Sequence, residues 1–241
     1  MNNLYSIRQV AEILGKNIIT LRRWEKAGKL MSVRSNGGHR YYQKDEIERF
    51  LSKQDIFKMA QKWVKAKDAK EPADIFYCPT SDVFKIRLIR LEKELMSYPK
   101  LKELYSLIIA LAGEIGNNSY DHNLGNWPDV LGIFFGHNVQ TRQIILADRG
   151  LGVLATLKTI KPELNNHYDA LKVAFTETVT SRSPEHRGNG LKFVREVIAN
   201  YDISLIFETG NARLKIGPRN GTLHLRRVKK SIHGCLALIQ Y

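Results

Sequence analysis

The sequence predicts an α+β protein made of two domains joined by helices. Residues 1–52 contain two short helical patterns and then an Asn-Gly turn between two extended runs, as in a small helix-and-hairpin domain. Residues 100–241 alternate apolar runs of strand length with amphipathic helical patterns and end in further extended runs, which favours an α/β sandwich. Residues 53–99 keep helical spacing, so we expect linker helices there.

The composition limits the function classes to consider. The net charge of +14 and the pI of about 9.8 favour nucleic acid or another acidic partner. Cys78 and Cys235 are the only cysteines, too few for a disulfide framework or a zinc cage, which favours a reducing compartment. No apolar run is long enough to cross a bilayer, and the N-terminus is too polar for a signal peptide. We therefore expect a soluble cytoplasmic protein with no membrane partner.

The first domain begins with two short helices. Residues 7–14 form an amphipathic pattern that Ser6 can cap and that ends at Gly15. Residues 18–27 form a second, Arg-rich helical pattern that stops at Gly28. Two short helices joined by a tight turn are typical of a helix-turn-helix arrangement.

A basic hairpin and a third helix follow. Residues 31–34 and 39–42 are extended runs on either side of Asn36-Gly37, the strongest short hairpin signal. Residues 43–51 have helical spacing and should form the third helix.

Residues 4–51 resemble the winged-helix DNA-binding domain of MerR-type regulators and their excisionase relatives. The sequence segments at residues 5–7, 20–25, 28–30 and 38–42 carry this likeness. The resemblance implies that the second helix enters the major groove of double-stranded DNA. The implied DNA contacts are Thr20, Arg22 and Arg23 on phosphates or base edges, and Arg34, His39 and Arg40 on the flanking backbone. We expect Trp24 and Tyr41 to pack between the second helix and the wing and not to stack on bases.

The middle of the chain predicts a helix and a linker, then a short strand and a longer helix. Apolar positions in residues 57–64 have helical spacing, and a linker is expected around residues 65–72. Residues 75–82 read as a strand and a helix cap, followed by a helix over residues 83–96. This last helix either dimerises the protein or packs on its own domain.

A carboxylate and an amide lie one turn apart near the end of the next helix. Glu114 and Asn118 are i, i+4 partners beside an apolar stripe, and Asp121 is one turn further on. A Glu can accept a proton from an attacking water, and an Asn can hold a metal-bound water. The pattern indicates magnesium-dependent phosphate chemistry, and a solvated helix face is the alternative.

Two glycine motifs follow in the same domain. Asp148 ends an apolar strand and precedes Gly150 and Gly152. A carboxylate there can accept a hydrogen bond from an exocyclic amine, and glycine lets a base approach the backbone. Gly188 and Gly190 precede another helical pattern, where exposed N–H groups suit phosphate oxygens.

In this order and spacing, the three motifs over residues 100–241 resemble the GHKL (Bergerat-fold) ATP-binding family of gyrase, histidine kinases, MutL and anti-sigma kinases. The resemblance implies that ATP and Mg²⁺ are cofactors. It implies Glu114 as general base, Asn118 as magnesium ligand, Asp148 as adenine reader, Gly150 and Gly152 as its loop, and Gly188 and Gly190 as the phosphate end of a lid. Further implied ATP contacts are Asp121, Arg187, Leu191 and Thr222.

The remaining elements complete the second domain. Residues 131–135 and 142–147 should form a hairpin, residues 151–158 and 168–178 helices, and residues 178–187 the lid. We expect a helix at residues 191–198 and four strands at residues 203–207, 212–216, 222–226 and 234–239. The family places a Gly-Thr pair near the nucleotide on a late strand, and Gly221-Thr222 and Gly234-Cys235 compete for that position. Basic residues on these strands add a second positive surface that either contacts DNA or protects a sheet edge.

These observations predict a bacterial DNA-binding transcriptional regulator whose DNA binding or assembly is controlled by ATP. The alternatives are an anti-sigma-type protein kinase or ATPase, and an excisionase-like accessory factor of a mobile element. No His precedes Glu114 in residues 83–112, so autophosphorylation in the manner of histidine kinases is not expected. A homodimer and a protein partner are left open.

Overall fold

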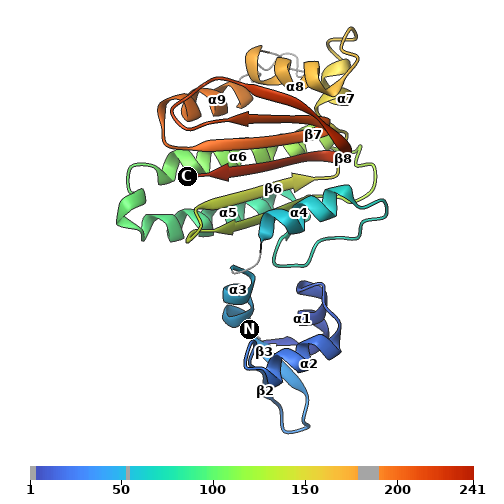
Figure 1. Ribbon diagram of the computed structural model, residues 1–241, viewed down its shortest axis with the longest axis vertical. Coiled ribbons are helices and arrows are strands. Elements are labelled where there is room, and N and C mark those ends of the chain that lie inside the picture. Colours follow the sequence, from blue (N-terminus) through green and yellow to red (C-terminus); the bar gives the residue numbers. More distant parts are fainter. Residues whose placement is uncertain (1–3, 53–54, 179–189) are drawn as a thin grey trace. The chain divides into compact units, whose positions relative to one another are not determined.

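A computed structural model describes residues 4–52, 55–178 and 190–241 (Figure 1). The chain divides into two compact units. The first comprises Met1–Ile56 and Pro72–Phe76, and the second comprises Phe57–Glu71 and Tyr77–Tyr241. The expected α+β class is confirmed, because helices occur together with a five-stranded antiparallel sheet.

The first unit contains the two short helices and the hairpin that the sequence predicts. Its elements are β1 (Leu4–Ser6), α1 (Ile7–Ile13), α2 (Ile18–Lys26), β2 (Val33–Arg34), β3 (Arg40–Gln43) and α3 (Lys44–Ser52). The strands form a three-stranded sheet in the order β1-β3-β2. Strand β1 was missed, since a three-residue strand is too short to show alternation and depends on pairing with β3.

Side-chain caps fix where these helices begin. Ser6 and Gln9 form a capping box at α1, in which the Gln9 side chain accepts a hydrogen bond from the Ser6 N–H at 2.8 Å. At α2, Asn17 Oδ1 accepts from the Thr20 N–H at 2.7 Å. The helices pack on a core that includes the fully buried Val10, Leu21, Tyr42 and Ile47.

The second unit contains a mixed set of helices around one sheet. Its elements are α4 (Ile56–Lys65, from Phe57 onwards), β4 (Tyr77–Cys78), α5 (Ser81–Met96), a 3₁₀ turn (Pro99–Leu101), α6 (Tyr105–Asn123), β5 (Ile133–Asn138), β6 (Gln143–Asp148), α7 (Gly152–Lys158), α8 (His167–Thr176), α9 (Gly190–Asn200), β7 (Ser204–Ile216) and β8 (His224–Gln240). The strand order is β4-β5-β6-β8-β7.

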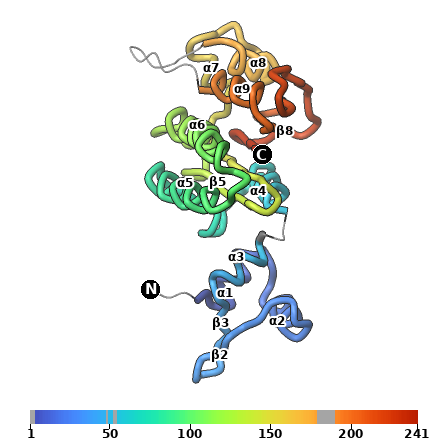
Figure 2. Tube along the Cα trace, turned by 90° about the vertical axis from the view of Figure 1, so that its left-hand side faces the viewer, coloured from blue at the N-terminus to red at the C-terminus, as the bar shows by residue number. Residues whose placement is uncertain are grey.

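Within this unit, helices cover both faces of the sheet (Figures 1 and 2). Helices α5 and α6 lie along one face, and α4 lies on the other, where Trp63 packs on Phe134 of β5 with ring centroids 6.3 Å apart. The main core lies between the sheet and the helices α5, α6, α8 and α9. The compact unit thus begins at Phe57 and not at residue 100.

Helix α5, for which the sequence left two roles open, packs on its own unit. Phe84, Leu91 and Leu95 are fully buried in the main core. Ile86 and Ile89 on the same helix stay about half exposed, at 53% and 51%. The buried side therefore packs α5 on its own unit, and Ile86 and Ile89 are exposed on its other side.

The prediction of four separate strands after α9 was wrong, because two long strands, β7 and β8, span all four runs. Strand β7 continues through a β-bulge at Gly210, where its register with β8 shifts between Thr209 and Gly210 and again between Gly210 and Ala212, with most of the unpaired residues on β8. Gly210 has φ +52°, a left-handed conformation that glycine adopts without strain. Gly210 and Asn211, which separate the predicted strands at residues 203–207 and 212–216, therefore lie inside β7.

The bulge also changes which residues of β7 face the helices. Before it, the odd-numbered Leu205 and Phe207 belong to the main core, and after it the even-numbered Leu214 and Ile216 do. An extra residue shifts the two-residue alternation of a strand by one position. Among residues 4–52, 55–178 and 190–241, none of the helices combines the length and the apolar composition of a membrane-spanning segment.

Candidate functional site

A cavity of about 440 Å³ lies in the second unit, beside the end of β6. Helices α6, α7 and α9 and strands β6, β7 and β8 contribute to its wall. Its volume falls in the range usual for small-molecule sites. The predicted site residues that line it are Glu114, Asn118, Asp121, Asp148, Gly152, Gly190 and Leu191.

Glu114 and Asn118 present free polar groups to this cavity. Both lie on α6, one turn apart, and within the described part of the chain neither side chain has a hydrogen-bond or ion-pair partner. A β-carbon at Gly190 would lie 1.7 Å from Glu114 Oε1, so any larger residue would displace this carboxylate from its present position. The arrangement provides a carboxylate and an amide that are available to a ligand, a metal or water.

Asp148 is held deep in the cavity wall at 2% exposure. Its Oδ1 accepts a hydrogen bond from the Gly150 N–H and its Oδ2 from the Ser119 hydroxyl, both at 2.8 Å. Burial raises the pKa of the Asp148 carboxyl, although hydrogen bonds from Gly150, Ser119 and the Cys235 backbone act in the opposite direction. These donors fix the orientation of the carboxylate before any ligand arrives.

The two glycines after Asp148 are required by close packing within the protein. A β-carbon on Gly150 would lie 2.2 Å from the Asn123 carboxamide, and Gly150 does not line the cavity. Gly152 has φ +75°, and a β-carbon there would lie 2.9 Å from the Thr209 hydroxyl oxygen. This need for glycine differs from the expected approach of a base to the backbone.

Sequence reasoning missed the side chains that hold this loop. Asn123 Nδ2 donates to the Ser119 carbonyl, and Asn123 Oδ1 accepts from the Leu151 N–H, both at 2.7 Å. The Thr209 hydroxyl oxygen accepts from the Val153 N–H at 3.2 Å. One signal for the first pair was present, since Ser119 and Asn123 repeat the four-residue spacing of polar residues in α6.

The two candidates for the late-strand position, Thr222 and Cys235, lie in different places relative to the cavity. Cys235 on β8 lines it, whereas Thr222 lies on an exposed loop before β8 and is not part of its wall. The Thr222 N–H instead bonds to the Asn220 side chain at 2.8 Å. Thr222 therefore lies outside the cavity wall, whereas the Thr209 hydroxyl on β7 bonds directly after the glycine loop, at the Val153 N–H.

Part of the predicted phosphate end cannot be placed. Arg187, Gly188 and nearly all of the expected lid fall outside the described residues. Gly190 is the first residue of α9, and it lies in the cavity wall with Leu191.

The residues of the cavity fit a magnesium ion that is held mainly by waters and by the phosphate oxygens of a bound molecule. The described residues contain no cluster of three or more His, Cys, Asp and Glu side chains that could hold a metal by themselves. Mg²⁺ usually keeps several waters and takes only one or two protein ligands together with phosphate oxygens. Asn118, whose amide is free, suits such a partial site.

On the first unit, the basic residues of α2 are free. Arg22 and Arg23 are exposed, and in the described residues they have no side-chain partner. The Thr20 hydroxyl, in contrast, donates to Asn17 Oδ1 at 2.8 Å and takes part in the helix cap. Two guanidinium groups therefore remain available to DNA phosphates or bases on this helix.

The hairpin residues predicted to contact DNA divide into two kinds. His39 and Arg34 are exposed, and Arg34 lies 4.0 Å from Glu25. Arg40 is tied to α2, since its Nε donates to Glu25 Oε2 at 2.7 Å. Hydrogen bonds from Ser32 and Arg40 lower the pKa of the Glu25 carboxyl. Arg40 therefore joins the hairpin to the helix.

The Trp24 ring packs on the third helix, with its centroid 5.1 Å from that of Phe50 on α3, whereas the sequence predicted packing between the second helix and the wing. The second basic surface is on β8 of the other unit, where Arg226, Arg227, Lys229 and Lys230 are all exposed.

Two comparisons with known proteins each match a short part of the chain. A type II methyltransferase, M.Eco47II of Escherichia coli, is 44% identical over 55 residues, which are 22% of this chain and 13% of that protein. This chain therefore matches only a small part of that relative's length. Residues 6–42 match the family described as "MerR family regulatory protein". Since these residues also form two capped helices and a hairpin, residues 6–42 are a MerR-family helix-turn-helix domain.

Proposed function

We propose that this protein is a DNA-binding regulator whose second unit binds ATP with Mg²⁺ and thereby controls DNA binding or assembly. The MerR-family match supports the DNA-binding part. The ATP-dependent control and the GHKL type of the second unit are the proposal. The methyltransferase activity of the short relative does not enter it, since the match covers 13% of that protein.

One observation carries the proposal for ATP. Residues from three separate motifs, Glu114 and Asn118 on α6, Asp148 at the end of β6 and Gly190 at the start of α9, meet around one cavity. The buried carboxylate of Asp148 suits the exocyclic amine of adenine. The N-terminus of α9 suits phosphate oxygens. Asn118 would hold Mg²⁺, which when bound neutralises phosphate charge.

The proposed DNA site is the exposed side of α2 together with the hairpin. Arg22 and Arg23 would contact phosphates or base edges, and Arg34 and His39 the flanking backbone. Arg40 would act indirectly, by holding the hairpin on α2. If two copies bind as a dimer, the target should contain two half-sites with a spacing set by the dimer.

The decisive experiment measures both ligands on the same variants. Isothermal titration calorimetry would measure MgATP binding to the wild type, D148N and D82N. Asp82 is a matched control because its side chain is 84% exposed on α5. We expect D148N to weaken ATP binding roughly 10- to 100-fold, since a hydrogen bond to a charged group contributes about 1.5–3 kcal/mol. D82N should bind as the wild type does.

The DNA arm uses a duplex selected from a random pool by the full-length protein. Its affinity would be measured by fluorescence anisotropy with and without MgATP. ATP should change the affinity of the wild type and of D82N but not that of D148N, because a ligand shifts a DNA-binding equilibrium only if it binds. Failure of the wild type to bind ATP would refute the nucleotide site and leave the DNA-binding unit unaffected.

A second candidate function, ATP hydrolysis or phosphate transfer to a partner protein, is favoured by Glu114. Its carboxylate is free within the described residues and could accept a proton from an attacking hydroxyl or water. Phosphate release by the wild type that E114Q abolishes, with ATP affinity unchanged, would support this function. Equal rates for the two proteins would argue for a binding site without catalysis.

A further inference from the structure

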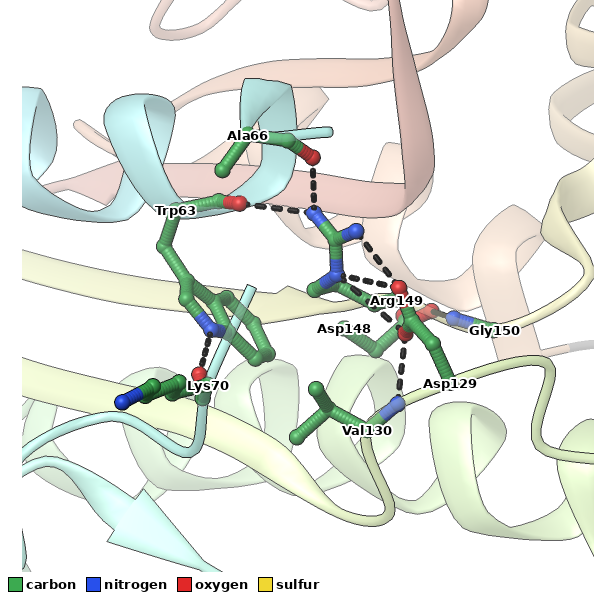
Figure 3. Close-up of polar contacts among 8 residues, drawn as sticks. All are labelled: Trp63, Ala66, Lys70, Asp129, Val130, Asp148, Arg149 and Gly150. Carbon is green, nitrogen blue, oxygen red and sulfur yellow. Dashed lines mark hydrogen bonds and ion pairs between the residues drawn. The ribbon is translucent and has the colours of Figure 1, made fainter. Parts of the chain in front are cut away.

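Arg149 lies between Asp148 and Gly150 in the glycine motif, and its side chain is fully buried, at 0% exposure. Asp148 lines the cavity, whereas Arg149 does not. Its guanidinium bonds to Asp129 and to the end of α4, the helix on the other face of the sheet (Figure 3). Of these two consecutive residues, Asp148 thus faces the cavity and Arg149 faces the end of α4.

The guanidinium of Arg149 caps the end of α4. Its Nη1 donates to the Trp63 carbonyl at 2.8 Å and to the Ala66 carbonyl at 3.0 Å. The last carbonyls of a helix lack partners within the helix, and a cation there also interacts favourably with the helix dipole. Arg149 therefore adds donors from outside the helix to this turn, where the Trp63 carbonyl also accepts from the Ala66 N–H at 3.2 Å.

Asp129 holds the other edge of the same guanidinium. Arg149 Nε donates to Asp129 Oδ2 at 2.9 Å and Nη2 donates to the same oxygen at 2.5 Å. Burial tends to raise the pKa of the Asp129 carboxyl, but bonds from Arg149 and from the Val130 N–H lower it overall. This carboxylate orients the guanidinium, so that the fork of Arg149 points at α4.

The position of α4 in the chain gives this contact its significance. From Phe57 to Glu71 the chain belongs to the second unit, but the residues before it, up to Ile56, and the residues after it, Pro72–Phe76, group with the first unit. Within this segment, the Trp63 indole N–H donates to the Lys70 carbonyl at 2.8 Å and so joins α4 to the residues that follow it. The segment that contains α4 is therefore flanked in sequence on both sides by residues of the first unit.

We propose that Arg149 is a positioning residue that transmits occupancy of the Asp148 cavity to α4, and through α4 to the MerR-family unit. The inference rests on the proposed nucleotide site. A ligand that moves the backbone at Asp148 and Gly150 also moves Arg149 between them. The buried guanidinium carries this movement to the carbonyls of Trp63 and Ala66, because it has discrete bonds to them and no solvent to replace those bonds.

Hydrogen exchange with mass spectrometry tests the proposal on the full chain, with MgATP as the probe. Two peptides are followed, residues 57–71 for α4 and residues 114–123 for the cavity wall. In the wild type, MgATP should change exchange in both peptides several-fold. In R149K, which retains the charge but cannot form the fork, the response of residues 57–71 should disappear, while that of residues 114–123 remains.

The design includes two further variants. R142K is the matched control, since Arg142 is exposed and directly precedes β6, at the opposite end of the strand from Asp148. D129N leaves Arg149 in place and removes the carboxylate that orients it, so the α4 response should weaken even if R149K does not fold. Asp129 has a side-chain exposure of 35%, which makes this change easier to accommodate.

The outcomes separate the two proposals. A response at residues 114–123 with none at residues 57–71 in the wild type would overturn the role of Arg149 and leave the nucleotide site intact. A full α4 response in R149K or in D129N would also overturn it. No response in either wild-type peptide, together with no heat of MgATP binding, would overturn both proposals.

Discussion

Thr209 of β7 is paired directly with Cys235 of β8, and its hydroxyl joins three elements. The hydroxyl donates to the Gly234 carbonyl at 3.0 Å and accepts from the Val153 N–H at the start of α7 at 3.2 Å. Thr209 is fully buried. A hydroxyl is thus present at the floor of the glycine loop, although neither Thr222 nor Cys235 supplies it.

The first prediction concerns this hydroxyl. T209V keeps the shape of the side chain but leaves the Val153 N–H and the Gly234 carbonyl without a partner. We expect a loss of roughly 1–3 kcal/mol in the free energy of unfolding, measured by urea denaturation, because unsatisfied buried groups cost about that much. T209S retains the hydroxyl and should lose clearly less. Equal losses in the two variants would mean that the methyl group matters and the hydroxyl does not.

The second prediction concerns the stability of the protein without nucleotide. D148N should be at least as stable as the wild type in thermal denaturation, although it binds ATP poorly. The folded protein raises the pKa of Asp148 by burial, so the ionised carboxylate opposes folding in the absence of a ligand. A marked drop in Tm would show that Asp148 serves mainly to hold the fold.

The pH dependence of that comparison follows from the same shift. The folded-state pKa lies above the ordinary value of 3.8, so the folded protein binds this proton more tightly than the unfolded chain does. The cost of ionisation is absent below pH 3.8, grows as the pH rises from 3.8 to the raised pKa, and is constant above it. The stability of D148N relative to the wild type should therefore increase with pH over this window. A pH-independent difference would contradict a shifted Asp148.

The third prediction concerns Gly190. A β-carbon in G190A would displace the Glu114 carboxylate, which is the end of a flexible side chain and can move at little cost. We expect an unchanged Tm but MgATP binding weakened about tenfold, which corresponds to about 1.4 kcal/mol. G217A is the matched control, since a β-carbon at Gly217 meets no atom within 4 Å. Normal ATP binding by G190A would place the ligand away from Glu114.

The fourth prediction separates DNA-contacting arginines from Arg40. R22A and R23A should each weaken DNA binding and lower the salt slope by roughly 1, as expected when one phosphate contact is lost. R40A should instead destabilise the hairpin by roughly 1–2 kcal/mol, because Glu25 loses its ion-pair partner. Hydrogen exchange of residues 33–43 measures this effect. If residues 33–43 exchange as slowly in R40A as in the wild type, Arg40 does not stabilise the hairpin and should be assigned to the DNA contacts instead.

The sequence was most informative where structure is local. Caps by Ser6 and Asn17, the helix stop at Gly28 and the hairpin at Asn36-Gly37 depend on neighbouring residues, and the first unit forms as they predict. The grouping of Glu114 with Asp148 was implied by the resemblance of the ordered motifs to the GHKL family, and both residues line the same cavity.

The rest depends on contacts that no local pattern encodes. Asn123 acts through Leu151, and Thr209 acts through Val153 and Gly234, which are brought together only by strand register and helix packing. The sequence suggested no role for Arg149, because its bonds to the end of α4 join residues far apart in the chain. The continuity of β7 was hidden for the same reason, since a bulge and a turn use the same residue types.

The bulge at Gly210 makes β7 a strand of fixed length. Its first half places Thr209 under the glycine loop, and its second half places Leu214 in the core, although the two residues differ in parity. Deleting or adding one residue in this strand would move the side chains of one half to the opposite face of the sheet. The loop before β8 could change length without this effect. Insertions and deletions in relatives of this protein should therefore fall outside Ser204–Ile216, so an alignment that opens a gap within this strand would be misregistered.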